Sequence, residues 1–243
     1  MTGDTLYIDL MKKFKNLLEE HQLLNSDIII TGQALSVAEA IGQPDRQDFP
    51  LVKGKERLMQ ANFRGALGQA FTDMPGSFQG SLQEVAERIP RNNYQRAVLI
   101  ASMNAVLKYL GLIENTIHCK NNEPDACADK LADYIKSKYG DAALALIGLQ
   151  PAMCEKLARN FKVRLVDLDA DNIGQMKCGV LVEDPAKTRE IIAWCDVVVS
   201  TGSTVVNGTM PDFFMDKPVI FFGTSCAAAA YFMNLERFCS MAG

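Results

Sequence analysis

The sequence lacks several features that would assign it directly to a known class. It has one tryptophan and two histidines in 243 residues, and its net charge of -4 excludes the basic excess typical of nucleic-acid-binding proteins. Its most apolar stretches, residues 219–222 and 227–233, fall well short of the roughly 20 apolar residues that span a bilayer. No apolar segment typical of a secretory signal follows the N-terminus. We therefore expect a cytoplasmic protein that binds neither nucleic acid nor membrane.

The seven cysteines are an odd number and all lie from residue 119 onward. Without a secretory signal, this count favours reduced thiols over a disulfide framework. Cys154, Cys195 and Cys239 have apolar neighbours, which predicts that they pack in the core. Cys178 and Cys226 lie near predicted strand ends, so a reactive or ligating role stays open for them.

The first half of the sequence predicts a small α+β module. Apolar residues recur at helical spacing over residues 4–24, and the run DIIIT predicts a strand at residues 27–31. Ser81 and Glu84 have the spacing of a capping box ahead of a helix. Further expected elements are a hairpin through Gly32 and Gln33 into residues 34–41, bent antiparallel strands within residues 58–72, and a helix from Asn92 or Asn93 to Gly111.

The second half alternates strands and helices, a pattern typical of a doubly wound, mostly parallel α/β sheet. We place the boundary so that the α+β domain spans residues 1–111 and the parallel-sheet domain spans residues 112–243. Strands are expected at residues 142–147, 163–168, 179–182, 196–200 and 219–222, and helices at 125–139, 152–160, 186–194 and about 226–238.

Residues 196–210 read DVVVSTGSTVVNGTM, an apolar strand that runs into a segment rich in glycine and hydroxyl groups. The carboxyl ends of parallel strands share one edge of a sheet, so this loop should converge there with residues 148–151 and 223–225. The alternative is that these side chains merely complete turns and cap helices. The expected ligand-binding residues are Gly148, Pro151, Asp167, Thr201, Gly202, Ser203, Thr204, Asn207, Gly208, Thr209, Gly223, Thr224 and Ser225.

The turn at Gly148 has no G-x-G-x-x-G pattern, which disfavours a tight grip on a dinucleotide pyrophosphate. Asp167 lies about twenty residues later, where a nucleotide-binding fold places an acid on the ribose. The alternative role for Asp167 is to cap the loop that follows it. No Ser-His-Asp or Cys-His order stands out, and the sequence does not choose a catalytic residue.

A thiol and an imidazole stand side by side at His118 and Cys119, and together they suit a divalent or transition metal ion. Cys127 is too far along the chain for a zinc-knuckle pair with Cys119. Cys127, Leu131 and Ile135 follow one another at intervals of four residues, which predicts that Cys127 has a core position on a helix. His118 and Cys119 are therefore the expected metal ligands.

The second half resembles the domain family named "putative heavy-metal chelation". The segments that carry the resemblance read IGLQPAMCEKL, VRLVDLDADNIG, CDVVVSTGSTVVNGTMPDFF and KPVIFFGTSCAAAAYF. The resemblance covers roughly residues 112–243. Residues 95–107, QRAVLIASMNAVL, are similar to the enolase N-terminal-like domain that often precedes this family. The chain departs from many members at residues 227–230, where four alanines replace glycine, and this alters how closely a ligand can approach.

The resemblance implies a Rossmann-like C-terminal domain and a role in metal chelation or anaerobic cobalamin biosynthesis. Its motif positions fall on residues 148, 151, 201–204, 207–209 and 223–225. The leading hypothesis is a protein that binds a metal ion, or an anionic or metal-containing small molecule, in a cleft at the strand ends. One alternative is a transferase with a nucleotide or S-adenosylmethionine cofactor and Asp167 on its ribose. Another is a non-catalytic metallochaperone or scaffold. The apolar C-terminal helix could finish the core or form a homodimer contact.

Overall fold

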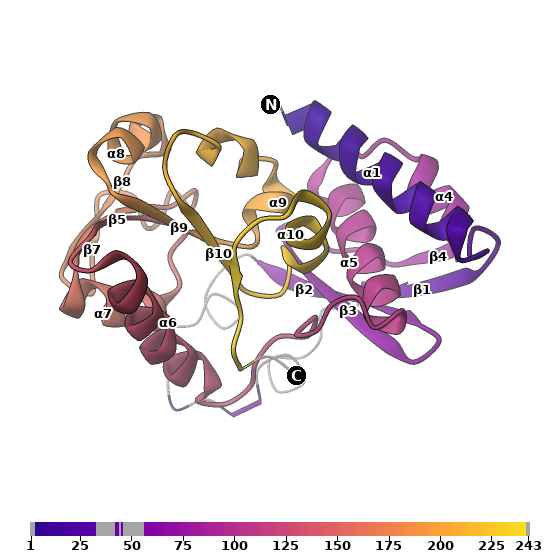
Figure 1. The fold of residues 1–243 in the computed structure, drawn as a ribbon, viewed down its shortest axis with the longest axis horizontal. Coiled ribbons are helices and arrows are strands. Elements are labelled where there is room, and N and C mark those ends of the chain that lie inside the picture. The colour runs from indigo at the N-terminus through magenta and orange to yellow at the C-terminus, as the bar shows by residue number, and fades with distance from the viewer. Residues whose placement is uncertain (1–2, 33–41, 44, 46–55, 242–243) are drawn as a thin grey trace.

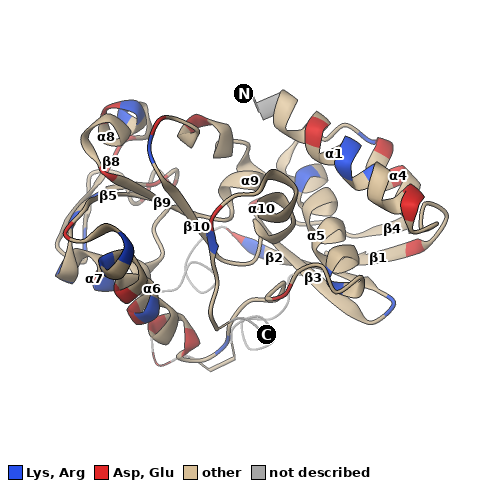
Figure 2. Cartoon of the chain, viewed as in Figure 1, with Lys and Arg blue, Asp and Glu red and all other residues tan. Residues whose placement is uncertain are grey.

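The computed structural model describes residues 3–32, 42–43, 45 and 56–241. Within them the chain forms an N-terminal module around an antiparallel sheet and a C-terminal module around a larger, mostly parallel sheet (Figure 1). Acidic and basic residues are interspersed over both modules (Figure 2). No helix in the described ranges is long and apolar enough to cross a membrane.

The N-terminal sheet has four strands in the order β3-β2-β1-β4, and every neighbouring pair is antiparallel. Arg64 and Gly65 connect β2 to β3 with φ angles of 50° and 87°, the left-handed conformation of a tight hairpin turn. This confirms the antiparallel strands predicted within residues 58–72. The hairpin predicted into residues 34–41 lies outside the described residues. The strands are β1 (Asp27–Thr31), β2 (Arg57–Phe63), β3 (Ala66–Thr72) and β4 (Phe78–Ser81).

Three helices accompany this sheet: α1 (Gly3–Glu20), α4 (Leu82–Glu87) and α5 (Asn93–Tyr109). The predicted capping box is confirmed, because the Ser81 hydroxyl accepts from the Glu84 N–H while the Glu84 carboxylate accepts from the Ser81 N–H. Asn92 caps α5 by accepting from the Gln95 N–H. α5 is buried over its central residues 97–107 and packs closely on β3.

The C-terminal sheet has seven strands in the order β11-β10-β9-β5-β6-β8-β7. All its pairs are parallel except β7–β8, which confirms the predicted α/β class with a large, mostly parallel sheet. The chain reverses direction across the sheet between β5 and β9, and this makes the topological switch point of the fold. The strands are β5 (Ala143–Ile147), β6 (Lys162–Val166), β7 (Met176–Lys177), β8 (Val180–Glu183), β9 (Val197–Thr201), β10 (Val219–Phe222) and β11 (Arg237–Phe238).

The helices of this module match the predicted alternation with strands. Pro151 occupies the first turn of α7, where its missing N–H costs nothing, and Gly140 ends α6 with a φ of 65°. The helical segments are α6 (Glu123–Tyr139), α7 (Pro151–Asn160), η1 (Pro185–Lys187), α8 (Thr188–Trp194), α9 (Thr204–Asn207), η2 (Met210–Phe213) and α10 (Ala227–Met233).

The single long helix predicted at about residues 226–238 is wrong. α10 stops at Met233 because Asn234 adopts a left-handed conformation, with φ 53°, and closes the helix by donating to the Ala230 carbonyl. The chain then turns back and β11 joins the sheet beside β10. Arg237 holds this segment extended by donating to the carbonyl oxygens of Gly223, Glu114 and Asn115.

One hydrophobic core crosses the two modules. Leu6 and Phe14 of α1 belong to the same buried cluster as Val205 and Ala228 of the C-terminal module. The buried Tyr7 hydroxyl donates to the Val205 carbonyl at 2.6 Å. The boundary at residues 111 and 112 stays a prediction. A second buried cluster, which includes Leu131 and Val197, lies wholly within the C-terminal module.

Candidate functional site

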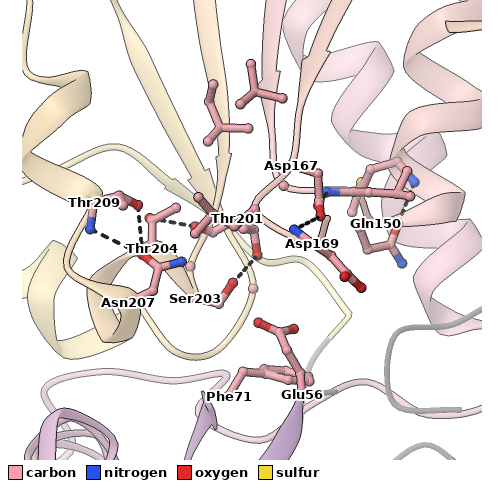
Figure 3. Close-up of a pocket in the computed structure, with 18 of the residues that line it drawn as sticks. Glu56, Phe71, Gln150, Asp167, Asp169, Thr201, Ser203, Thr204, Asn207 and Thr209 are labelled. Carbon is pink, nitrogen blue, oxygen red and sulfur yellow. Dashed lines mark hydrogen bonds between the residues drawn. The ribbon is translucent and has the colours of Figure 1, made fainter. Parts of the chain in front are cut away.

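A pocket of about 1340 Å³ lies where the carboxyl edge of the parallel sheet faces the open end of the β2–β3 hairpin, at the start of β2 and the end of β3 (Figure 3). The loops after β5, β6, β9 and β10 form one wall, which we call the loop wall. Glu56, Phe71, Thr72 and Asp73, at the ends of β2 and β3, form the facing wall, which we call the hairpin wall. The predicted convergence of strand-end loops is therefore observed, together with a second wall that the sequence did not reveal.

All but one of the predicted ligand residues line this pocket. The exception is Gly208, which ends α9 in a left-handed conformation, with φ 85°, beside the Arg96 guanidinium. The residues that the structure brings together are Gly148, Pro151, Asp167, Thr201, Gly202, Ser203, Thr204, Asn207, Thr209, Gly223, Thr224 and Ser225.

Two loops of the pocket touch at the switch point of the sheet. Gly148 has a φ of 88°, and a Cβ at this position would collide with the methyl group of Thr201. Glycine is thus favoured here for two reasons: its backbone conformation and the close approach of the neighbouring loop. The Gly148 N–H donates to the Val166 carbonyl at 2.7 Å, which ties the β5 turn to β6 as well.

The hydroxyl groups of the β9 loop bond largely to one another and to the loop backbone. Thr204 Oγ1 donates to the Thr201 carbonyl at 2.8 Å, and Thr201 Oγ1 lies 3.3 Å from Ser203 Oγ. Asn207 Oδ1 accepts from both the N–H and the hydroxyl of Thr209. The turn-completing role weighed from the sequence is therefore observed in the same residues that line the pocket.

Asp167 serves mainly as a backbone cap. Its carboxylate accepts from the N–H groups of Leu149 at 2.6 Å and Asp169 at 2.8 Å, and from the Asn172 side chain at 3.3 Å. These bonds join the loops after β5 and β6 and leave less of the carboxylate for a ribose. The geometry favours the capping alternative over the ribose-binding role.

The β10 loop fastens the two walls together. Ser225 Oγ accepts from the Phe71 N–H at 3.0 Å. The buried Asn104 of α5 donates to the carbonyl oxygens of Gln69 at 2.9 Å and Thr224 at 3.2 Å, and its Oδ1 accepts from the Ala228 N–H at 2.8 Å. These buried polar contacts fix the hairpin wall against the loop wall.

Glu56 is the most perturbed carboxyl group of the pocket. Burial raises its pKa to about 7, and the neighbouring carboxylates of Asp167, Asp73 and Asp169 add to the rise. Contact with the Ser203 hydroxyl opposes it. Sequence reasoning missed Glu56 and Asp73, because neither lies in a motif, and only the packing of the two sheets brings them to the pocket.

The two predicted metal ligands also line the pocket, together with the thiols of Cys127 and Cys239. Burial lowers the pKa of His118, whose Nδ1 donates to the Cys119 carbonyl at 2.6 Å. Burial raises the pKa of the Cys119 thiol far above its usual range, so it is protonated at neutral pH. Zinc and similar ions bind thiolates, so a metal that bound Cys119 would have to displace the thiol proton.

Among the described residues, no three histidine, cysteine, aspartate or glutamate side chains are grouped closely enough to hold a metal ion. The arrangement therefore does not fit a bare chelated ion. Cys154 and Cys195 are buried as predicted, whereas Cys239, predicted to pack in the core, is half-buried and borders the pocket. Cys226 is buried, and Cys178 is exposed at the pocket rim.

The described residues that line the pocket are mostly acidic where they are charged. Among them the lysine and arginine side chains are Lys177 and Arg189, and the acidic ones are Glu56, Asp73, Asp167, Asp169, Asp171 and Asp212. Such a surface attracts positive charge and repels anions.

Comparisons with known proteins agree on one family. Residues 131–234 match the family model described as "DUF364: Putative heavy-metal chelation", which confirms the expected resemblance over this segment. A DUF364 protein of unknown function from Pyrococcus horikoshii has the same fold at 17% identity, with a TM-score of 0.53 and coverage of 90% of this chain and 79% of that one. A DUF364 protein of unknown function from Desulfitobacterium hafniense DCB-2 gives a TM-score of 0.49 at 12% identity, over 73% of this chain and 72% of that one. No curated protein matches the chain.

Proposed function

We propose that this chain, which carries a DUF364 domain over residues 131–234, binds a metal-containing or cationic small molecule in the pocket between the loop wall and the hairpin wall. The observation that carries the proposal is the pocket itself, about 1340 Å³ at the switch point of a parallel sheet. Ligands of such sheets bind at this place, and pockets for drug-sized molecules measure roughly 300–1,000 Å³.

The size and the donor set favour a molecule over a bare ion. A bound ion needs about four to eight ligand atoms within roughly 2–2.6 Å, and the described residues offer no such group. A metal carried inside an organic ligand does not need a complete set of protein ligands. His118 and Cys119 at the pocket are placed to contact such a metal or its carrier.

The charge of the pocket narrows the class of ligand further. Among the described lining residues, six acidic side chains against two from lysine and arginine disfavour the anionic ligand considered from the sequence and favour one with positive charge. The local hydroxyl groups of Thr201 and Ser203 can then bind polar parts of the ligand.

Native mass spectrometry with metal analysis, on protein purified from cells without chelator, tests this proposal. We expect an added mass of an organic molecule, which Ser203→Ala should reduce and the exposed α6 variant Ser137→Ala should leave in place. Protein that carries neither a molecule nor a metal after mild purification, and shows no thermal shift with metal-containing cofactors, would contradict the proposal.

A nucleotide-type cofactor is a second possibility, supported by the position of the pocket at the switch point. It has less support than the first, since the Asp167 carboxylate already accepts two backbone N–H groups. Calorimetry with S-adenosylmethionine and ATP tests it. Binding that Asp167→Ala abolishes without unfolding the protein would favour it over the metal-containing ligand, and binding that this variant leaves intact would remove the ribose role.

A further inference from the structure

Glu56 reaches the pocket from the hairpin wall. It directly precedes β2, and its carboxyl group points toward Thr201 and Ser203 on the loop wall (Figure 3). The two walls belong to different sheets, so this glutamate faces groups more than 140 positions away in the sequence. It is therefore placed to contact a molecule held between the walls.

The charged groups that surround Glu56 are carboxylates. Asp73 approaches from the end of β3, and Asp167 and Asp169 approach from the loop after β6. Within the described ranges, no lysine, arginine or histidine forms an ion pair with Glu56. The negative charge of Glu56 is thus without a compensating cation among these residues, in a partly buried position.

Two of the neighbouring carboxylates are already engaged. Asp167 accepts backbone N–H groups from Leu149 and Asp169, and Asp73 accepts from the Asn93 side chain at 2.7 Å. Glu56 differs from both because its side-chain contact is with a hydroxyl group, that of Ser203. A hydroxyl can donate to the ionised carboxylate or accept from the protonated acid.

We propose that Glu56 binds a positively charged group of the ligand and gives up its own proton when that group binds. This inference rests on the proposed function of the pocket. The proton balance is simple: the protonated carboxyl group and the cation become a carboxylate–cation pair and one released proton. The ligand class is a cationic one, either an organic ammonium group or a divalent metal ion within a ligand.

The raised pKa of Glu56, about 7, sets the pH range of the effect. The group is mostly protonated at pH 6 and mostly ionised at pH 8, so cation affinity should fall roughly tenfold from pH 8 to pH 6. His118 also borders the pocket, and burial lowers its pKa, which favours its neutral form.

Isothermal titration calorimetry of the full chain with two probes, the nickel(II) complex of the macrocycle cyclam and spermidine, tests the inference at pH 6 and pH 8. We expect at least one probe to bind, about tenfold more weakly at pH 6, with proton uptake by the buffer at pH 6. Glu56→Gln should bind more weakly at pH 8 and lose the pH dependence. The matched control is Glu114→Gln, an exposed residue outside the pocket lining, which should behave as the wild type.

Either of two results would overturn the inference. In one, neither probe binds at pH 8. In the other, Glu56→Gln keeps the wild-type affinity and pH dependence. Thermal unfolding checks that Glu56→Gln is folded, which is expected because it removes a costly buried charge. Failure here is distinct from failure of the proposed function, because a molecule co-purified with the protein would support the pocket even if Glu56 took no part in binding it.

Discussion

The loop wall and the hairpin wall bring different kinds of group to the same pocket. The loop wall is made of turns whose hydroxyls and carboxylates bond to one another and to the local backbone, as Thr204 does with Thr201 and Asp167 does with Leu149. The hairpin wall contributes few groups, and one of them, Glu56, titrates near neutral pH. The loop wall thus supplies fixed shape and dipoles, and the hairpin wall supplies a charge that can change.

This difference separates two tasks that a single loop could not perform together. A loop whose polar groups are satisfied locally is rigid, and rigidity preserves the shape of the pocket. A buried carboxyl group that lacks a cationic partner has a raised pKa, and its ionised form destabilises the fold. The two kinds of group lie on separate sheets, which Asn104 and Ser225 join by hydrogen bonds.

The largest effect is expected from breaking the join between the walls. Asn104→Ala leaves two carbonyl oxygens and one N–H without partners in the core and should lower the free energy of unfolding by about 3–5 kcal/mol. Urea denaturation measures this. The control on the same helix is Ser102→Ala, which removes a buried hydroxyl that has no partner among the described residues and should change stability by less than about 1 kcal/mol. Equal losses in the two variants would contradict the role of Asn104.

The next largest effect is expected on the pH dependence of stability, from Glu56 of the hairpin wall. A pKa raised from 4.5 to about 7 means that the folded state holds a proton that the unfolded state has released. The contribution of Glu56 to stability should therefore fall as pH rises from about 4.5 to 7 and stay low above that range. Glu56→Gln should stabilise the protein at pH 8, by at most roughly 3 kcal/mol, and should have little effect at pH 4.5. Parallel urea titrations across this range check the sign, and a variant that is less stable than wild type at pH 8 would contradict it.

A smaller effect tests the close contact inside the loop wall. Gly148→Ala combines an unfavourable positive φ with a collision against Thr201, whereas Gly174→Ala has a similar φ of 79° with open space around its Cβ. Gly174→Ala should cost about 1–2 kcal/mol from backbone strain alone, and Gly148→Ala should cost more. Gly148→Ala should also weaken ligand retention in native mass spectrometry, and Gly174→Ala should not. Equal costs would show that the two loops can separate freely.

The smallest effect concerns the reactivity of two thiols that line the pocket. Cys178 is exposed on the turn between β7 and β8, while burial raises the pKa of Cys119. Brief labelling with iodoacetamide at pH 7.5 should therefore modify Cys178 well before Cys119, because the thiolate is the reactive form. Peptide mass spectrometry reads the order, and Cys178→Ser serves as the control. Faster labelling of Cys119 would show that its side of the pocket opens to solvent.

The sequence predicted the loop wall because its signals are local. Apolar runs that end in glycine and hydroxyl residues mark parallel strands, and parallel strands place their carboxyl ends at one edge whatever the rest of the chain does. Residues 148–151, 201–209 and 223–225 could therefore be placed together before their contacts were known. The Ser81–Glu84 capping box was also predictable, since both partners lie within one turn.

The hairpin wall could not be predicted in this way. Glu56 stands outside any motif, and its position depends on how one sheet packs against another. The prediction of a long C-terminal helix was wrong for a related reason. The alanine-rich run favours a helix, but the left-handed Asn234 and the three carbonyl contacts of Arg237 draw the next residues into the sheet. Tertiary contacts overrode local propensity at both places.

The bond between Tyr7 and Val205 has a consequence for the order in which the molecule is made. Tyr7 is synthesised well before its partner Val205, which follows it by 198 positions. The Lys13 ammonium group likewise donates to the carbonyl oxygen of Phe232, which lies 219 positions further along the chain. Helix α1 therefore remains without part of its native packing until Val205 and Phe232 have been synthesised, and the pocket can form only after the loop that follows β10. Slow folding, dependent on distant contacts, is the expected kinetic signature of this architecture.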